Sequence, residues 1–297
     1  MDSPPVLGES QEVAPGLRRI LAPNPSPMTH WGTNTYLIGS HEVAVVDPGP
    51  DDPDHLAAIL AAAGSRISHI LITHAHRDHS ALAPRLSQMT DAPILAFGTP
   101  EAGRSPVMAD LAAAGLSGGG EGVDIGFHPD QTLGHGDTLS GTDWQAEALH
   151  TPGHFAGHLS FAVGEAILTG DHVMGWASTL ISPPDGDLSA FMSSCATLSA
   201  CATRLFLPGH GAPISDPAER LDWLLSHRRA RGDAILETLG SGGATATELA
   251  QRIYTDVPAE LMPAATRNVF AHLVAFVEEN KVVAEPELSE HARFHPL

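Results

Sequence analysis

The chain has 297 residues, 42% of them apolar and 17% charged, which gives material for a buried core and excludes the composition of a disordered protein. Its formal net charge is −20 and it contains one lysine, Lys281, so its surface repels phosphate backbones and anionic membranes. Eighteen histidines and two cysteines, Cys195 and Cys201, favour imidazole chemistry over disulfides or thiolate metal sites.

The first 130 residues are typical of a sheet covered by helices. After a proline-rich segment, Pro23 to Pro27, the β-rich part begins with two strands that form a hairpin. The predicted elements are, in chain order, strands at 33–39 and 42–47, a helix near 53–63 ended by Gly64, a strand at 67–73, a helix near 80–89 and a strand at 93–97. Residues 98–130 contain three consecutive glycines and are predicted to be an insertion or lid, or a plain surface excursion.

Strands return after this segment, and the chain then becomes helical. The predicted elements are strands at 144–150, 158–163 and 166–169, a helix near 187–202, a strand at 204–207, helices at 218–239, 247–254 and 264–280, and a strand at 281–284. We therefore predict an α/β domain over residues 1–215 and a small helical domain over 216–297.

One string carries the strongest chemical signal, Thr73-His74-Ala75-His76-Arg77-Asp78-His79, which directly follows a predicted strand. Because side chains alternate along a strand, His74 and His76 lie on one side of the chain. Asp78 and His79 then turn across the loop toward a second point. Two imidazoles on one side, with a carboxylate and an imidazole on the other, form half of a site for two metal ions.

Three other predicted strands end in a histidine or an aspartate beside a glycine. Thr151-Pro152-Gly153-His154, Thr169-Gly170-Asp171 and Pro208-Gly209-His210 each follow an apolar run. Glycine allows tight backbone geometry at such positions. We expect these three endings to complete the metal site that the histidine cluster begins.

This set of residues, together with Asp47, resembles the five signature motifs of the metallo-β-lactamase superfamily. The resemblance implies an αββα sandwich with two divalent metal ions at one edge. Carried over residue by residue, the first metal ion is held by His74, His76 and His154, and the second by Asp78, His79 and His210. Asp171 would bridge both ions, and Asp47 would hydrogen-bond the loops that carry the ligands.

Imidazole and carboxylate ligands suit Zn²⁺ best, although they also accept Fe or Mn. Two cations on either side of one water molecule lower its pKa and leave a bridging hydroxide positioned to attack a carbonyl or phosphoryl group. Asp171 and Asp78 are therefore predicted to be catalytic as well as metal ligands, with Asp78 orienting the hydroxide. The expected function is metal-dependent hydrolysis.

The C-terminal part of the sequence indicates which group of the superfamily the chain resembles. Ser226-His227-Arg228 and Asn268-x-x-x-His272-Leu273 are similar to the tail of the β-lactamase-like protein 2 group, which implies a small winged-helix-like domain. Some members of that group are single-strand endoribonucleases. Since a charge of −20 leaves no obvious basic track for a phosphate chain, a small ester, thioester or lactone is favoured over RNA, although nucleic acid is not excluded. Arg228 and Arg231 are predicted to share a helix face that is solvated or ion-paired.

The substrate contacts are the least specified part of the site. His158, His172, Trp31 and Trp176 are candidates for lining the pocket, and His158 and His172 are equally consistent with supporting the metal ligands from behind. A metal-bound scaffold without activity is a further alternative, which the complete ligand set argues against.

Cellular location and assembly follow from what the sequence contains. No stretch of 18 apolar residues is present, and residues 1–5 resemble no secretion signal, so we expect a cytoplasmic protein that does not bind membranes. A homodimer is compatible with the tail.

Overall fold

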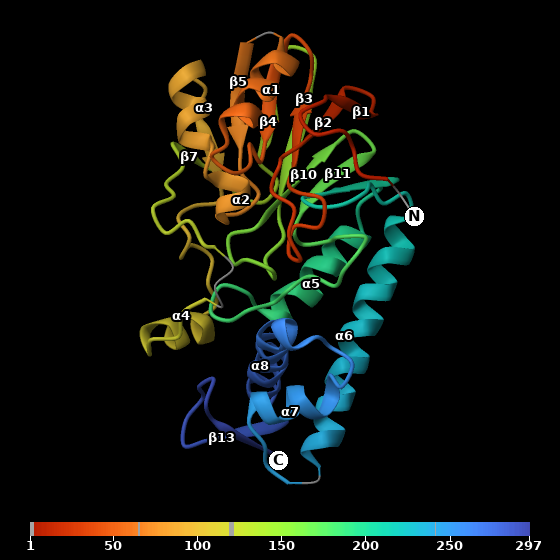
Figure 1. Cartoon of the computed structure of the whole chain (residues 1–297). Coiled ribbons are helices and arrows are strands. Elements are labelled where there is room, and N and C mark those ends of the chain that lie inside the picture. Colours follow the sequence, from red (N-terminus) through yellow and green to blue (C-terminus); the bar gives the residue numbers. More distant parts are fainter. Residues whose placement is uncertain (1–2, 65, 119–121, 241) are drawn as a thin grey trace.

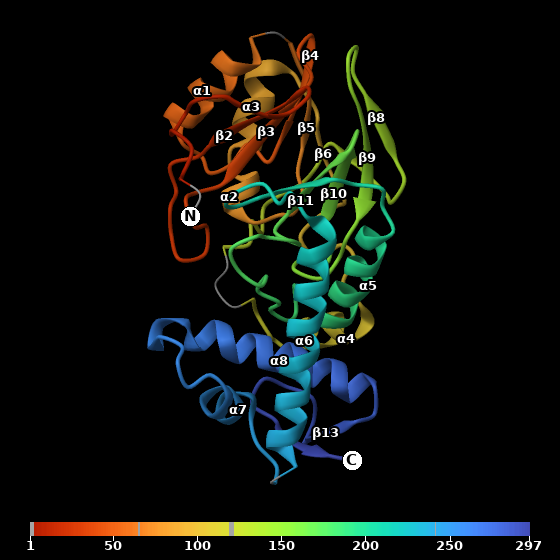
Figure 2. The same ribbon diagram turned by 90° about the vertical axis from the view of Figure 1, so that its right-hand side faces the viewer.

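The computed structural model describes residues 3–64, 66–118, 122–240 and 242–297 and contains two facing β-sheets with helices on both outer faces (Figures 1 and 2). The first sheet has the order β1-β2-β3-β4-β5-β6-β7, antiparallel from β1 to β4 and parallel from β4 to β7. Its strands are β1 Gln11–Ala14, β2 Leu17–Leu21, β3 Asn34–Ile38, β4 Glu42–Val46, β5 Arg66–Leu71, β6 Ile94–Ala96 and β7 Gln131–Thr132.

The second sheet has the order β12-β11-β10-β9-β8, with only the β11–β12 pair parallel. Its strands are β8 Thr138–Ser140, β9 Gln145–His150, β10 Leu159–Val163, β11 Ala166–Gly170 and β12 Leu205–Pro208. The two sheets bury a shared apolar layer in which Val46 and Leu71 of the first sheet meet Phe161 and Leu168 of the second. This burial is the main force holding the sheets face to face.

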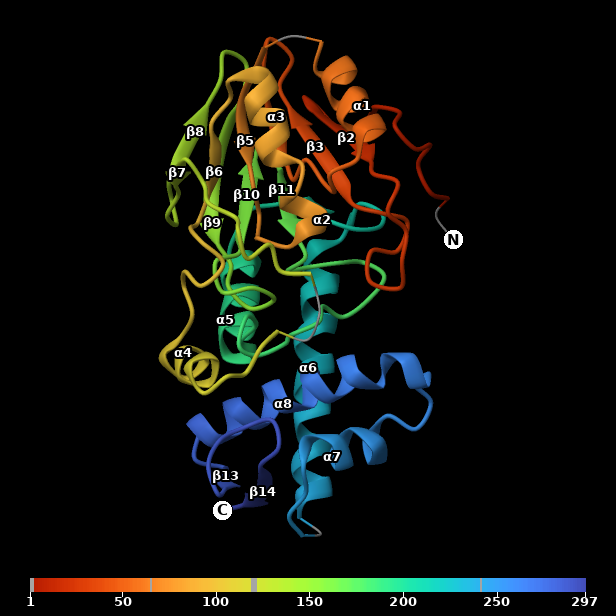
Figure 3. The ribbon, with the colours of Figure 1, turned by 60° about the vertical axis from the view of Figure 1, so that its left-hand side comes forward.

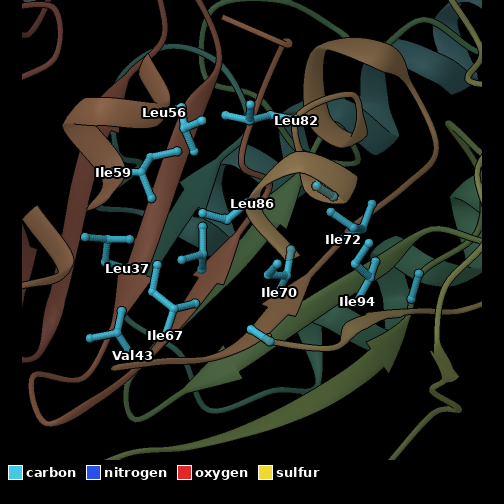
Figure 4. Close-up of a cluster of buried hydrophobic side chains, with 14 of the residues drawn as sticks. Leu37, Val43, Leu56, Ile59, Ile67, Ile70, Ile72, Leu82, Leu86 and Ile94 are labelled. Carbon is cyan, nitrogen blue, oxygen red and sulfur yellow. The ribbon is translucent and has the colours of Figure 1, made fainter. Parts of the chain in front are cut away.

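Three helices follow strands of the first sheet, namely α1 Pro53–Ala63, α2 Arg77–Ser80 and α3 Ala83–Thr90. Asp52 caps α1 by accepting a hydrogen bond from the His55 N–H, and Gly64 ends it in the left-handed conformation. Leu56 and Ile59 of α1 belong to one buried cluster with Leu37 and Val43 of the sheet (Figure 4).

The outer face of the second sheet is covered by α5 Leu188–Ser199 and by the first part of α6 Pro217–Leu239. Phe191 and Cys195 of α5 are fully buried against this sheet. The layers therefore run helix, sheet, sheet, helix, and the αββα sandwich expected from the resemblance is confirmed.

A smaller helical unit lies at the end of α6 (Figures 1 and 3). Its elements are α7 Ala246–Ile253, a short 3-10 turn Ala259–Leu261, α8 Met262–Glu278 and the hairpin β13 Val282–Glu285 with β14 Arg293–Pro296. Helix α4 Pro106–Ala113, from the predicted insertion, packs Met108 and Leu111 into the core of this unit. The boundary at 215 and the lid remain predictions.

The structure corrects two expectations about elements. The β-rich part begins before the proline-rich segment, because β1 and β2 already form a hairpin whose two arginines have partners: Arg18 donates to Ala62 O and Arg19 to Gln11 Oε1. The single helix near 80–89 is instead the pair α2 and α3, separated at Ala81 and Leu82.

Some positions lie outside the described residues, namely Met1, Asp2, Gly119 and Gly120 of the glycine run, and Glu121. Within the described part, no helix is long and apolar enough to cross a membrane.

Candidate metal centre

The seven side chains singled out at strand ends converge at one edge of the sandwich. His74 and His76 lie in the loop after β5, and Asp78 and His79 lie on α2. His154 follows β9, while Asp171 and His210 come directly after the parallel strands β11 and β12. Three groups of ligand atoms lie within 4.8 Å of one another: His74, His76 and His154; His74, His79 and Asp171; and Asp78, His79 and His210.

Distances within these groups are close to those that a bound metal ion requires. His76 Nδ1 lies 2.9 Å from His74 Nε2 and 3.2 Å from His154 Nε2. Nitrogens on a tetrahedral Zn²⁺, at roughly 2.0–2.1 Å from the ion, are about 3.3 Å apart. His210 Nε2 lies 3.2 Å from both Asp78 Oδ2 and Asp171 Oδ2. The geometry therefore fits a cation better than a direct contact between ring nitrogens.

Hydrogen bonds on the far side of the rings fix which nitrogen faces the centre. His154 Nδ1 donates to Leu180 O at 2.7 Å, and His210 Nδ1 donates to Gly32 O at 3.1 Å. Because a carbonyl only accepts, each Nδ1 carries the proton and each Nε2 presents a lone pair to the centre. Such outer contacts orient histidine ligands in metal proteins.

Asp47 does the same for the histidine cluster. This buried carboxylate accepts from Thr73 N at 2.8 Å, from Thr73 Oγ1 at 2.7 Å and from His79 Nδ1 at 2.9 Å. Since the Thr73 hydroxyl donates to Asp47, it accepts from His74 Nδ1 at 3.0 Å. Both histidines thereby present Nε2 to the centre.

Two atoms of the centre lack a hydrogen-bond partner in the described part of the chain. These atoms, His79 Nε2 and Asp171 Oδ1, are buried and face each other across 3.5 Å. An unpaired buried polar atom is costly, and a cation between the two removes that cost. Gly209 leaves the necessary room, because a Cβ there would overlap Asp171 Oδ1 and lie 2.8 Å from His79 Cε1.

Charge divides the centre into two halves. Burial, followed by the neighbouring His154, lowers the pKa of His76 to about 3, so the His76 ring stays neutral. Burial also opposes the charged form of His210, but Asp171 and Asp78 outweigh it and raise the pKa of His210 to about 9. The carboxylate half therefore attracts a positive charge, which a metal ion supplies as well as a proton does.

A cavity of about 460 Å³ opens onto the centre and is mostly apolar. Its lining includes the candidate ligands His76, Asp78, His154, Asp171 and His210, the apolar side chains Met28, Met174, Trp176, Leu180 and Leu261, and the polar Asn268. Leu261 and Asn268 belong to the helical unit, so both parts of the chain build this cavity.

The tryptophans expected to contact substrate lie beside this cavity. Trp176 is 37% exposed and lines both the cavity and a second hollow of about 660 Å³. His30 stacks between Trp31 and Trp176, at ring-centroid distances of 4.6 and 4.8 Å. Trp31 and Trp223 line the second hollow only.

The structure does not place His158 and His172 in the cavity lining. Both are fully buried; His158 lies behind His74, with ring centroids 5.2 Å apart, and its Nδ1 contacts Thr151 Oγ1 at 3.0 Å. His172 packs against Phe191. Of the two alternatives left open for these histidines, this placement favours support of the ligands from behind over contact with substrate.

Arg228 also differs from its predicted solvated or ion-paired environment. It is buried and donates to Thr179 O and, at 3.1 Å, to Asn268 Oδ1. Sequence reasoning missed these partners, since an arginine that bonds a backbone carbonyl 49 positions away leaves no pattern in the sequence. The apolar cavity residues Met28, Met174 and Leu180 were also missed, because no sequence pattern marks a residue that lines a cavity.

Comparisons with known proteins agree with this geometry. A model of the metallo-beta-lactamase superfamily matches residues 28–235, and a model of the beta-lactamase associated winged helix domain matches residues 245–290. The chain is 30% identical to the beta-lactamase-like protein 2 homolog of Drosophila melanogaster, over 89% of this chain and 88% of the relative. It is also 30% identical to an atrochrysone carboxyl ACP thioesterase of Aspergillus chevalieri, over 86% and 79%.

Solved structures show the same fold. A metallo-beta-lactamase family protein from Thermus thermophilus superposes with a TM-score of 0.76 and 25% identity, covering 96% of this chain and all of the other. A beta-lactamase domain protein from Burkholderia ambifaria has a TM-score of 0.81 at 23% identity, covering 100% and 96%.

Proposed function

The chain belongs to the metallo-beta-lactamase superfamily and is a metal-dependent hydrolase, and we propose that it uses two divalent metal ions to hydrolyse a small carboxylic ester, thioester or lactone. The observation that carries this proposal is the inward-facing set of ring nitrogens beside the unpaired Asp171 Oδ1. Four of these rings, His74, His79, His154 and His210, are fixed by a hydrogen bond on the far side. We assign Zn²⁺ as the metal because imidazole and carboxylate ligands suit it.

The proposed ligands divide between the two ions as the distances suggest. One ion is held by His74, His76 and His154, the other by Asp78, His79 and His210, and Asp171 lies between the two groups. When bound, two such cations lower the pKa of a water molecule between them and polarise the acyl oxygen of the substrate.

The residues of this chain supply position and charge. Asp78 and Asp171 both line the cavity, but the Asp78 side chain is 25% exposed and that of Asp171 only 9%, so Asp78 is the carboxylate of the centre that is more open to the cavity. A carboxylate there orients the attacking water by accepting its proton in a hydrogen bond. Asp47 keeps His79 in the tautomer that leaves Nε2 free.

The cavity supports an acyl substrate of modest size. Met28, Met174 and Leu180 offer an apolar wall, and the half-exposed Trp176 offers an aromatic face at the mouth. Apolar walls with a few polar groups are typical of sites for small molecules. The similarity to an acyl carrier protein thioesterase supports a thioester in particular.

A phosphodiester substrate is less well supported. Of the residues that line the cavity, Arg77 alone is an arginine or lysine, and the chain carries a net charge of −20. A strand of RNA needs several cations along its path.

The test is a metal-reconstituted sample assayed for metal content and for turnover of p-nitrophenyl esters, an acyl thioester, a homoserine lactone, bis-p-nitrophenyl phosphate and a labelled RNA. We expect close to two metal ions per chain and turnover of carbonyl substrates. The Asp171→Ala variant should lose turnover while keeping its circular dichroism spectrum. Cleavage of RNA or the phosphodiester alone would refute the proposed substrate class, and retained turnover in Asp171→Ala would refute the role of that carboxylate.

A further inference from the structure

Residues 179–181 connect the candidate metal centre to the helical unit. On the side of the centre, the Thr179 hydroxyl donates to the backbone oxygen of Asp171, and Leu180 O accepts from His154 Nδ1 at 2.7 Å. Two proposed ligands are thus held by adjacent residues of one short segment. Thr179 and Ile181 are fully buried, and Leu180 is nearly so.

The opposite side of the same segment is held by α6 and α8. Arg228 of α6 donates to Thr179 O, and the Ile181 N–H donates to Asn268 Oδ1 of α8 at 3.1 Å. Arg228 also donates to Asn268 Oδ1, at 3.1 Å, so the two side chains form one unit. Both side-chain hydrogen bonds that the structure gives Arg228 go to this segment or to Asn268.

Burial of the charged Arg228 side chain at this position costs free energy. It is 3% exposed, its Nε has no hydrogen-bond partner in the described part of the chain, and the two partners that the structure gives its guanidinium are neutral oxygens. Its guanidinium lies over the Phe191 ring at 5.4 Å, a contact that offsets only part of the desolvation cost. The favourable contribution of this buried cation to the structure is therefore its hydrogen bonding to residues 179–181.

We propose that Arg228 and Asn268 are positioning residues of the hydrolase, which hold residues 179–181 so that His154 and Asp171 keep the orientation required for metal binding. The inference rests on the proposed metal centre. It assigns the winged-helix unit a direct part in building that centre, in addition to lining the cavity. If the carbonyl that accepts from an imidazole shifts, the ring loses its preferred tautomer and its orientation toward the metal. Loss of such an outer contact weakens metal binding roughly 10- to 100-fold.

The test measures the affinity of the metal-free full chain for Zn²⁺ by competition with a chromophoric chelator. Arg228→Met removes the donors and keeps an apolar stem of similar length, and Arg229→Met is the matched control at an exposed neighbour. Asn268→Ala removes the shared acceptor, whereas Asn268→Asp retains an oxygen at that place. We expect 10- to 100-fold weaker Zn²⁺ binding for Arg228→Met and Asn268→Ala, and an affinity within about threefold of wild type for Asn268→Asp and Arg229→Met.

Equal Zn²⁺ affinity in Arg228→Met, Asn268→Ala and Arg229→Met would overturn the inference. If Arg228→Met does not fold, the comparison of Asn268→Ala with Asn268→Asp decides, because these variants differ in the acceptor. A purely structural role predicts that both Asn268 variants lose stability without separating in metal affinity. Since affinity is measured without substrate, a wild-type chain that binds metal but cleaves no ester would refute the proposed function and leave this inference standing.

Discussion

Replacing Asp47 by asparagine is expected to remove metal from one half of the centre while leaving the fold intact. The carboxylate accepts three hydrogen bonds, and Oδ1 must remain an oxygen because Thr73 N points at it. The amide NH₂ of asparagine therefore takes the place of Oδ2, where it faces His79 Nδ1 and the Thr73 hydroxyl. His79 Nδ1 then has to accept, so the ring proton moves to Nε2, the atom that faces the centre.

The magnitude follows from these contacts. Two charge-assisted hydrogen bonds to Oδ2 are lost, about 1.5–3 kcal/mol each, and the new amide donor restores part of this, so we expect the free energy of unfolding to fall by about 2 kcal/mol. A protonated Nε2 cannot bind a cation, so affinity at the site that includes His79 should fall roughly 10- to 100-fold or more.

The assay combines zinc content per chain with the imidazole ¹⁵N shifts of the metal-free protein. Burial opposes the charged form of His79, but Asp78, followed by Asp171, outweighs it and raises the pKa of His79 well above its ordinary value, so the shifts are recorded at an alkaline pH where this ring is neutral. We expect the zinc content to drop from about two ions to about one, and His79 to change from the Nδ1–H to the Nε2–H tautomer. An unchanged tautomer together with full zinc content would refute the reasoning, because it would show that Asp47 does not set the state of His79.

Three further changes test other parts of the structure. In Gly209→Ala the new methyl group meets Asp171 and His79, so Zn²⁺ should bind at least about tenfold more weakly, whereas Gly134→Ala, with its nearest neighbour at 3.6 Å, should bind normally; equal affinities would contradict the geometry. Trp176→Ala removes an aromatic contact of about 0.5–1.5 kcal/mol, so kcat/KM should fall about 2- to 13-fold for aryl esters and stay constant for ethyl acetate; a uniform loss would count against it. Burial, followed by Arg228, lowers the pKa of His272 to about 3. A histidine that stays neutral when folded gives its full stability above pH 6.5 and loses it as the pH falls, by about 2 kcal/mol at pH 5; His272→Leu should flatten this loss in urea unfolding, and an unchanged slope would show that His272 is not its source.

The structure brings the predicted ligands together because they follow strands that end at one edge of the sandwich. Asp171 comes directly after β11, and His154 and His210 stand a few residues beyond β9 and β12. Arg228, in contrast, was misjudged. Its partners are a backbone carbonyl and an amide 40 positions away, and neither leaves a periodic or compositional signal.

The fold shows the same division. Helix α1 lies where it was predicted, near 53–63, and Gly64 ends it as expected. Strand β2 was missed because Arg18 and Arg19 make it look polar, although Arg19 is buried and bonds Gln11 of the neighbouring strand. A strand that contains hydrogen-bonded, buried arginines of this kind can be recognised only when their tertiary partners are known.

Helix α6 has a consequence for how this molecule can move and be rebuilt. It runs without interruption for 23 residues, about 34 Å, from the sandwich into the winged-helix unit. The sandwich and the winged-helix unit are thus joined by one continuous helix, and no flexible linker separates the two parts along it. We therefore expect the cavity to open through the short loops at its rim, such as residues 26–29. The number of residues in this helix also fixes the direction in which each side chain points. One residue inserted before Arg228 rotates everything beyond it by about 100° and turns the guanidinium away from Thr179. An exchange of winged-helix units between relatives must therefore preserve the residue count of this helix as well as its sequence.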